Sequence, residues 1–199
     1  MPRGAVGPPA GPRVDGASRQ PRRVRGSLSR DEILAAGLRI AREDDLRRLT
    51  MQRLGKQLGV TGMALYRHFR NKQELVDGIL DHFAREAAVT AHATDRASWR
   101  LWLRRTCHGM YGALADAPGV IPFVATSSGW RFGPAALATM DEALAVLREA
   151  GFEPRLAVEI YTTLLALVVG FATLGGADAP TRVVFEHALD RTLDALDPH

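Results

Sequence analysis

Beyond residue 27, apolar residues recur along the chain at intervals of three and four, with charged or polar residues between them. This spacing is that of an amphipathic helix, and it returns in segment after segment toward the C-terminal end. No segment alternates apolar and polar residues as a half-exposed strand would, and no unit repeats at a fixed period. The pattern therefore predicts an all-α fold.

The first predicted helix begins after Ser29 and ends near Asp44. Glu32 follows Ser29 by three residues, which is the spacing of a capping box, and Leu28 can pack against Ile33 across the cap. The side of this helix that would enter the core consists of Ile33, Leu34, Gly37, Leu38 and Ala41.

Three further helices are predicted up to about Thr90. The second begins after Thr50 and ends at Gly59, the third is very short and begins after Thr61, and the fourth begins at Asn71. The bend that Gly59 permits between the second and third helices gives the geometry of a helix-turn-helix. In that motif the second helix of the pair enters the major groove of DNA with its N-terminal residues at the base edges.

Hydrogen-bond donors gather at the ends of these helices, where helix N-termini also direct free backbone N–H groups outward. Both kinds of donor suit phosphate oxygens. The side-chain donors are Thr50, Thr61, Tyr66, His68 and Lys72. The helix pair and its donors together predict a DNA-binding head over residues 28–72, continued by a connecting helix over 73–94.

The C-terminal part, residues 95–199, is predicted to contain four or five more helices. One begins after Ser98, one begins at Gly133–Pro134 and is closed by Gly151, one runs from Arg155 to Leu174, and the last begins at Thr181. The segment from Pro118 to Ala125 is expected to be short and irregular.

The helix over 155–174 is apolar on every side and must be covered on every side. The uncharged stretch from Ile160 to Ala177 is just long enough to raise the question of a membrane span, but its threonines and glycines favour burial in a core or a subunit interface. We therefore expect a homodimer in which this helix and the last one form a four-helix bundle. The expected interface residues are Leu164, Val168, Phe171, Val184, Leu189 and Leu193.

Charge is divided along the chain. The net charge of +4 combines +10 over residues 1–72 with −6 over residues 73–199. One end is suited to a polyanion and the other is not, which argues against a uniformly basic architectural DNA-binding protein. The single cysteine, Cys107, excludes a disulfide framework and a cysteine-built zinc site, and it suits a cytoplasmic protein.

The first 27 residues are rich in proline, glycine and arginine and carry almost nothing apolar to bury. This composition predicts a disordered basic arm. It lacks the apolar core of a secretory signal and the periodicity of a transit peptide. The arm would either add non-specific DNA affinity or serve only as a solubilising extension.

The run from Leu49 to Lys72 resembles the DNA-binding signature of the TetR family of bacterial transcriptional repressors. The specific part is Leu65-Tyr66-x-His68-Phe69 followed by Lys72, and the resemblance covers residues 28–90. Gly133–Pro134, the run from Leu144 to Phe152, and Val168-Val169-Gly170-Phe171 are similar to the C-terminal domain of the Tet repressor branch. The resemblance implies an all-α homodimer with paired helix-turn-helix heads, and a small-molecule pocket in each subunit.

Matched residue by residue, the resemblance implies phosphate contacts for one set of residues and groove contacts for the start of the third helix. The phosphate set is Thr50, Tyr66, His68 and Lys72, and the groove set is Thr61, Gly62, Met63 and Ala64. Gln52 stands where many members carry an arginine that reaches a base. Gln52 and Arg67 are the long polar side chains suited to bases, with a phosphate contact equally open for Arg67. Arg53 completes the expected DNA-binding set.

The small-molecule pocket would be lined by aromatic residues and a histidine of the C-terminal half. The candidates are Phe83, Trp102, His108, Tyr111, Phe123, Trp130 and Tyr161. Ligands of the Tet repressor branch coordinate a magnesium ion through histidines and acidic partners, but that constellation does not map onto this sequence, so no metal and no cofactor is expected.

Catalysis has weak candidates. Cys107 and His108 are adjacent on a predicted helix, so their side chains diverge by about 100° and cannot form a nucleophile–base pair. The histidines lack zinc-binding spacing, and no glycine-rich phosphate loop follows a strand. We expect no catalytic residues. The predicted function is a ligand-responsive, DNA-binding repressor of a palindromic operator; the alternatives are a non-inducible architectural DNA-binding dimer and a helical-bundle enzyme.

Overall fold

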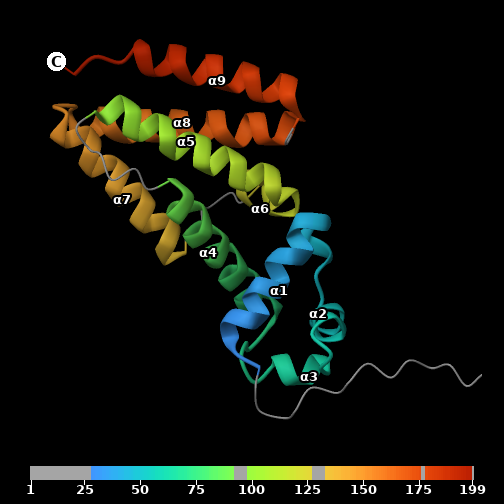
Figure 1. Ribbon diagram of the computed structural model, residues 1–199. Coiled ribbons are helices and arrows are strands. Elements are labelled where there is room, and N and C mark those ends of the chain that lie inside the picture. The colour runs from blue at the N-terminus through green and yellow to red at the C-terminus, as the bar shows by residue number, and fades with distance from the viewer. Residues whose placement is uncertain (1–27, 92–97, 127–132, 176–177, 199) are drawn as a thin grey trace, which may run out of the picture.

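The computed structural model describes residues 28–91, 98–126, 133–175 and 178–198. The expected basic arm over residues 1–27 lies outside this part of the chain. The described residues form helices and no strand (Figure 1), which confirms the all-α prediction.

Four helical elements form the head. They are α1 (Arg30–Glu43), the 3₁₀ turn η1 (Leu46–Arg48), α2 (Met51–Gln57) and α3 (Gly62–Leu65). The capping box of α1 is present, because the Ser29 hydroxyl accepts from the Glu32 N–H at 3.1 Å and Glu32 accepts from the Ser29 N–H at 2.9 Å. The sequence pattern does not reveal η1.

The body consists of α4 (Lys72–Ala91), α5 (Trp99–Asp116), the 3₁₀ turn η2 (Pro118–Val120), α6 (Ile121–Thr126), α7 (Pro134–Glu149), α8 (Pro154–Gly175) and α9 (Ala179–Asp194). The caps at Ser98 and Asn71 hold as predicted, with the Asn71 carboxamide oxygen 2.8 Å from the Glu74 nitrogen. The segment over 118–125 is helical and not irregular, and α9 begins two residues before Thr181.

Helix α4 joins head and body. It packs against α1 on the head side and against α5 and α7 on the body side, while α8 packs against α5, α7 and α9. Figure 1 shows α1, α2 and α3 at one end of the molecule and α9 at the other. By length and composition α8 could cross a membrane, but in this fold it is a bundle helix that buries Ile160, Leu164, Val168 and Ala172 among others.

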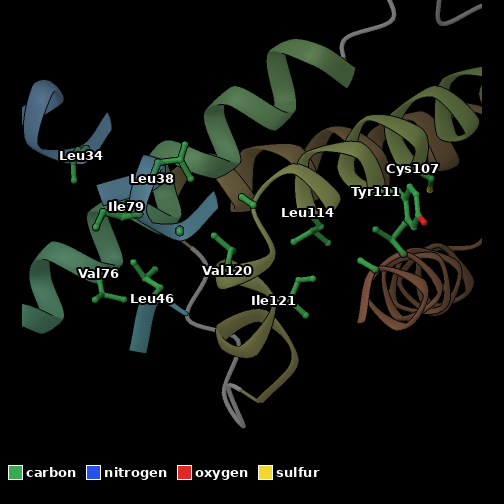
Figure 2. Close-up of a cluster of buried hydrophobic side chains, with 14 of the residues drawn as sticks. Leu34, Leu38, Leu46, Val76, Ile79, Cys107, Tyr111, Leu114, Val120 and Ile121 are labelled. Carbon is green, nitrogen blue, oxygen red and sulfur yellow. The ribbon is translucent and has the colours of Figure 1, made fainter. Parts of the chain in front are cut away.

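One continuous apolar core runs from the head into the body. Figure 2 shows Val120 and Ile121 between the side chains of Leu38 and Leu46 in the head and that of Leu114 on α5. The turn η2 reaches α1 so closely that a Cβ on Gly119 would lie 2.6 Å from the Ala41 carbonyl oxygen, and closer still to that of Asp44. Only glycine fits this contact without displacing backbone.

Candidate functional site

Three glycines shape the junction between α2 and α3. Gly59 has a φ of +69°, in the left-handed region that glycine adopts without strain. A Cβ on Gly55 would lie 2.9 Å from the backbone nitrogen of Gly62, and one on Gly62 would lie 3.3 Å from that of Gln52. The two helices therefore touch backbone to backbone. This contact explains why a glycine occupies position 62, although glycine has a low helix propensity.

The residues of α3 and the turn after it divide between core and surface. Leu65 and Phe69 are buried, whereas the side chains of Met63 and Tyr66 are 74% and 48% exposed. The Thr61 side chain caps no backbone N–H, although Thr61 is the N-cap of α3. A hydroxyl, a phenol and a thioether thus face outward around one short helix.

The other residues expected to contact DNA lie in the head or at its junction with α4. Thr50, Gln52, Arg53, Arg67 and Lys72 are exposed, and Gly62, Ala64 and His68 are half-buried. They come from α2 and its N-cap, from α3 and the turn after it, and from the start of α4, at the end of the molecule away from α9 (Figure 1). The predicted set therefore gathers in the region that the helix-turn-helix geometry requires.

Two of these cations already have partners in the head. The Arg53 guanidinium lies 2.6 Å from Asp44, and this hydrogen bond is the main reason that the pKa of Asp44 is lowered. The Lys72 ammonium donates to the Arg47 carbonyl oxygen at 2.7 Å. An ammonium has three donors, so Lys72 is positioned by η1 and retains donors for another acceptor.

A second site lies in the body, on one side of α4. It is an apolar cavity of about 140 Å³ between α4, α5, η2, α6, α7 and α8. Its lining consists of Leu80, Phe83, Ala84, Ala87, Ala88, Met110, Leu114, Val120, Phe123, Val124, Gly133, Ala136, Thr139, Tyr161, Leu165 and Val169. Burial raises the pKa of Tyr161 to about 12, so its hydroxyl stays protonated and able to donate at neutral pH.

The structure brings three of the seven predicted pocket residues into this cavity, namely Phe83, Phe123 and Tyr161. Trp102 and Tyr111 lie outside the lining and are buried, with the Tyr111 ring stacked on Phe185 at 4.3 Å between centroids. These two aromatic residues were expected in the pocket because sequence alone does not separate a core ring from a cavity ring. Trp130 lies outside the described residues.

His108 lines a different hollow, on the other side of α4. This polar hollow has a volume of about 210 Å³ and is bounded by Arg42, Phe83, Glu86, Ala87, His108, Gly109, Gly112, Ala113, Asp116 and Ala117. Arg42 of α1 and Glu86 of α4 form an ion pair of 3.0 Å beside it. Phe83 and Ala87 line both the apolar cavity and the polar hollow, so this stretch of α4 separates them.

The surface of α8 and α9 differs from the one expected for subunit contact. Leu164, Val168, Leu189 and Leu193 are buried within the single chain, so these four side chains are not available to a partner. Phe171 is half-buried and Val184 is 53% exposed. The large apolar residues that are exposed on the described parts of these helices are Leu156, Val158, Leu174, Val183 and Val184. Helical periodicity located the apolar sides of these helices but not which side faces the chain's own core.

The fold and site define a class of protein: a helix-turn-helix head joined by one long helix to a helical domain that encloses a cavity. Residues 33–79 match the family model for bacterial regulatory proteins of the tetR family, and residues 92–195 match that for the tetracyclin repressor-like C-terminal domain. The chain therefore belongs to the TetR family of bacterial regulatory proteins.

Two relatives show the range of similarity. The chain is 33% identical over 146 residues to the class A tetracycline repressor protein from transposon 1721 of Escherichia coli, covering 72% of this chain and 65% of that protein. It is 28% identical over 155 residues to the HTH-type transcriptional repressor Rv1353c of Mycobacterium tuberculosis. That match covers 77% of this chain and 59% of the length of the relative.

Solved structures share the fold. BioQ of Mycobacterium smegmatis has a TM-score of 0.67 at 28% identity, covering 84% of this chain and 97% of that one. A structure of BioQ with its natural double-stranded DNA operator has a TM-score of 0.66 at 26% identity, with 84% and 99% of the two chains covered. A TetR variant of Acinetobacter baumannii AYE in complex with minocycline has a TM-score of 0.71 at 24% identity, with 84% and 95% covered.

Sequence reasoning missed most of the cavity wall. Thirteen lining residues were not predicted, and the small ones on α4, Ala84, Ala87 and Ala88, carry the one signal that could have found them. Three small side chains on one stretch of a helix that packs against large neighbours leave room beside it. The spacing does not tell which neighbours border that room.

Proposed function

We propose that this protein is a transcriptional repressor that binds a palindromic DNA operator as a homodimer and is released from it by a small-molecule effector. The observation that carries the proposal is the position of α4. Its first residue, Lys72, belongs to the exposed set of the head, and Phe83 and Ala87 farther along it wall the cavity of the body. One rigid helix thus touches both sites.

In the head, each residue of the predicted DNA-binding set has a role that its chemistry suggests. The carboxamide of Gln52 suits the N6 and N7 edge of adenine, and the guanidinium of Arg67 suits a guanine or a phosphate. Thr50, Thr61, Tyr66, His68 and Lys72 suit phosphates, while Met63 and Ala64 offer apolar contact in the groove beside Gly62. Arg53 would contact DNA from its ion pair with Asp44.

Base and phosphate roles are separable by experiment. Gln52→Ala should relax base preference at one symmetric operator position, at a cost of about 1–3 kcal/mol per bidentate contact. Lys72→Ala should weaken all sequences alike and reduce the salt slope by about one unit per lost phosphate contact. Operator selection from random duplexes, followed by fluorescence anisotropy at several salt concentrations, measures both effects. An unchanged consensus for Gln52→Ala would remove its base-reading role.

The homodimer is assigned to the outward face of α8 and α9. Val158, Leu174, Val183 and Val184 give this face exposed apolar side chains that a second copy would cover. Val184→Asp should produce monomers in sedimentation equilibrium and weaken operator binding, because two half-sites are then no longer held together. Ala138→Asp, on an exposed part of α7, is the matched control and should stay dimeric. A monomeric parent protein at micromolar concentration would contradict the assignment.

Only one separation of the two recognition helices in the dimer fits both grooves of the operator. Release therefore requires an effector that favours a position of α4 at which this separation is different. A ligand beside Phe83 would displace α4 from the cavity side, and the polar hollow on its other side offers room for that displacement. An effector that binds the released form about 100-fold more tightly supplies a coupling of roughly 2.7 kcal/mol.

Reciprocity gives the test of this coupling. Operator DNA must weaken effector binding by the same factor by which the effector weakens operator binding. Calorimetry with an effector found in an operator-release screen, run with and without operator, measures it. Equal affinities in the two titrations would show that the body is a dimerisation scaffold and not a sensor.

A further inference from the structure

We propose that the effector is an uncharged, mostly apolar molecule with about the bulk of one substituted aromatic ring, held by a hydrogen bond to Tyr161, and that it binds without a metal ion. The inference rests on the proposed function only in taking this cavity as the effector site. It adds the chemical class of the ligand.

Charge is the first selective property of the cavity. Among the described lining residues no side chain is charged, and the walls are aliphatic and aromatic groups such as Leu80, Phe83, Met110 and Leu165. A buried ion without a partner loses its hydration with no compensation, and this cost is far larger than that of a neutral polar group. The cavity should therefore bind a neutral ligand more tightly than an anionic or cationic ligand of the same shape.

The same lining does not fit a metal-chelated ligand. Its side-chain oxygen donors are the hydroxyls of Thr139 and Tyr161, and it contributes no carboxylate or imidazole. The part of the chain that the structure describes contains no group of three or more His, Cys, Asp or Glu residues placed to hold a metal ion. Magnesium prefers carboxylate and water oxygens in octahedral geometry. The donors of this cavity therefore do not suit a ligand that carries a magnesium ion.

Volume limits the size of the ligand. The cavity of about 140 Å³ is similar to an engineered apolar cavity of about 150 Å³ that binds benzene. A single ring with a short alkyl substituent fills such a space. The cavity is partly open to the surface, so a larger ligand would have to extend out of it.

One residue of the cavity wall, Tyr161, can form a hydrogen bond with the ligand. The Tyr161 hydroxyl makes no hydrogen bond to another described residue, whereas the Thr139 hydroxyl already donates to the Ala135 carbonyl oxygen at 3.2 Å. With its pKa raised to about 12, Tyr161 remains a neutral phenol. It can donate to a ligand hydroxyl or carbonyl oxygen, or accept from a ligand hydroxyl.

Three matched probes test charge and hydrogen bonding: 4-ethylphenol, ethylbenzene and 4-ethylbenzoate, titrated into the full chain at neutral pH by ligand-observed NMR. The phenol should bind at least about 10-fold more tightly than the benzoate, which is an anion at this pH. Ethylbenzene should bind about 3- to 10-fold more weakly than the phenol, because it lacks the hydroxyl. The magnesium complex of tetracycline, as a fourth probe, should not bind.

Variants locate the binding. Tyr161→Phe should lower the affinity for 4-ethylphenol to that for ethylbenzene and leave the affinity for ethylbenzene unchanged. Ala136→Phe, which projects a ring into the cavity, should abolish binding of both neutral probes. Ala138→Phe, on the exposed side of the same helix, should not. Circular dichroism of each variant confirms that it is folded.

The outcomes separate this inference from the proposed function. Tight binding of the benzoate or of the magnesium complex, an unchanged phenol affinity in Tyr161→Phe, or no binding of any probe would overturn the ligand class. Binding of 4-ethylphenol as expected, but with operator affinity unaltered in anisotropy, would leave the ligand class standing and remove the proposed release. Release of operator by the benzoate would overturn the ligand class and leave the proposed release standing.

Discussion

Helix α4 has an empty space on each side, and the two spaces differ in kind. The cavity toward α7 and α8 is lined by apolar side chains with two hydroxyls, whereas the hollow toward α1 and α5 has Arg42, Glu86, His108 and Asp116 on its walls. Burial of an apolar ligand is favourable only in the first, because the second keeps its charged groups hydrated. The difference indicates where a ligand binds and where the helix has room to move.

The contacts across the two spaces also differ in strength. On the apolar side Leu80 and Phe83 of α4 line the cavity and pack against the continuous core. Across the polar hollow, Arg42 and Glu86 form a pair whose side chains are both 47% exposed, and a pair of this kind contributes about 0–1 kcal/mol. Beside the hollow α4 is thus held to α1 by a weak contact, whereas nearer the head Ile79 of α4 packs tightly against Gly37 of α1. Four predictions test this contrast, in descending order of expected effect.

Phe83→Ala removes the side chain that separates the two spaces. Phe83 is half-buried and packs against the core, so its truncation should destabilise the protein by about 2–4 kcal/mol, as measured by urea denaturation. Binding of 4-ethylphenol should also be lost, because the polar hollow then opens into the cavity. Retention of both stability and ligand binding would show that the Phe83 side chain does not separate the cavity from the hollow.

Alkaline pH should lower the stability of the protein through Tyr161, which lines the apolar cavity. Burial raises the pKa of Tyr161 from 10.0 to about 12, so between these values the unfolded chain loses a proton that the folded chain keeps. The free energy of unfolding should therefore fall as pH rises through this interval. The buried Cys107 thiol, whose pKa is raised from 9.0 to about 12, acts in the same direction from pH 9 upward.

Urea denaturation at about pH 8 and about pH 11 measures this decline. Tyr161→Phe should reduce it, and Tyr66→Phe, at an exposed position, should leave it as in the parent protein. An undiminished decline in Tyr161→Phe would mean that Tyr161 is as well hydrated in the folded protein as in the unfolded chain.

Gly112→Leu should fill the polar hollow. A Cβ at Gly112 meets no atom within 4 Å, so the leucine side chain starts in open space beside the hollow, and the gain in helix propensity should stabilise α5 by up to about 1 kcal/mol. We expect operator affinity without effector to stay the same and the effector-induced loss of affinity to shrink about 10-fold. Gly112→Ala is the control, since it gains the propensity but leaves the hollow open. Normal release in Gly112→Leu would show that α4 does not use this space.

Arg42→Gln should have the smallest effect. It removes an exposed ion pair across the hollow, and the loss in unfolding free energy should stay below about 1 kcal/mol. The change should be smaller still at high salt, because ions screen exposed charges. A loss of several kcal/mol would mean that the polar side of α4 is held as firmly as the apolar side.

The head was the more predictable region because its signals are local. Ser29 with Glu32, Thr50, Gly59 and Asn71 each fix a helix end through neighbours a few residues away, and α1, α2 and α3 of the head, with the start of α4, were placed correctly. The Leu65-Tyr66-x-His68-Phe69 run then supplied the family. Two features of the head were not predicted, namely η1 and the glycine contact between α2 and α3. Both depend on how helices meet in space.

The cavity and the outer face of the body could not be read in the same way. Val168 and Leu174 are both apolar residues of α8, yet one is fully buried and the other is 80% exposed. Their spacing tells that they lie on different sides of the helix, but the choice of side is made by α5, α7 and α9. Cavity residues such as Thr139 and Val169 depend likewise on six elements meeting around one space.

The contact of Gly119 with the end of α1 bears on how freely such proteins exchange their parts. Because the backbone of η2 rests directly on the Ala41 carbonyl, the head is not a detachable module that any body can carry. A hybrid that joins this body to another head can pack only if the new α1 ends in the same place and leaves the same bare backbone there. Exchange of the head together with η2 preserves this contact, whereas an exchange that separates η2 from α1 preserves it only when the new α1 ends in the same place.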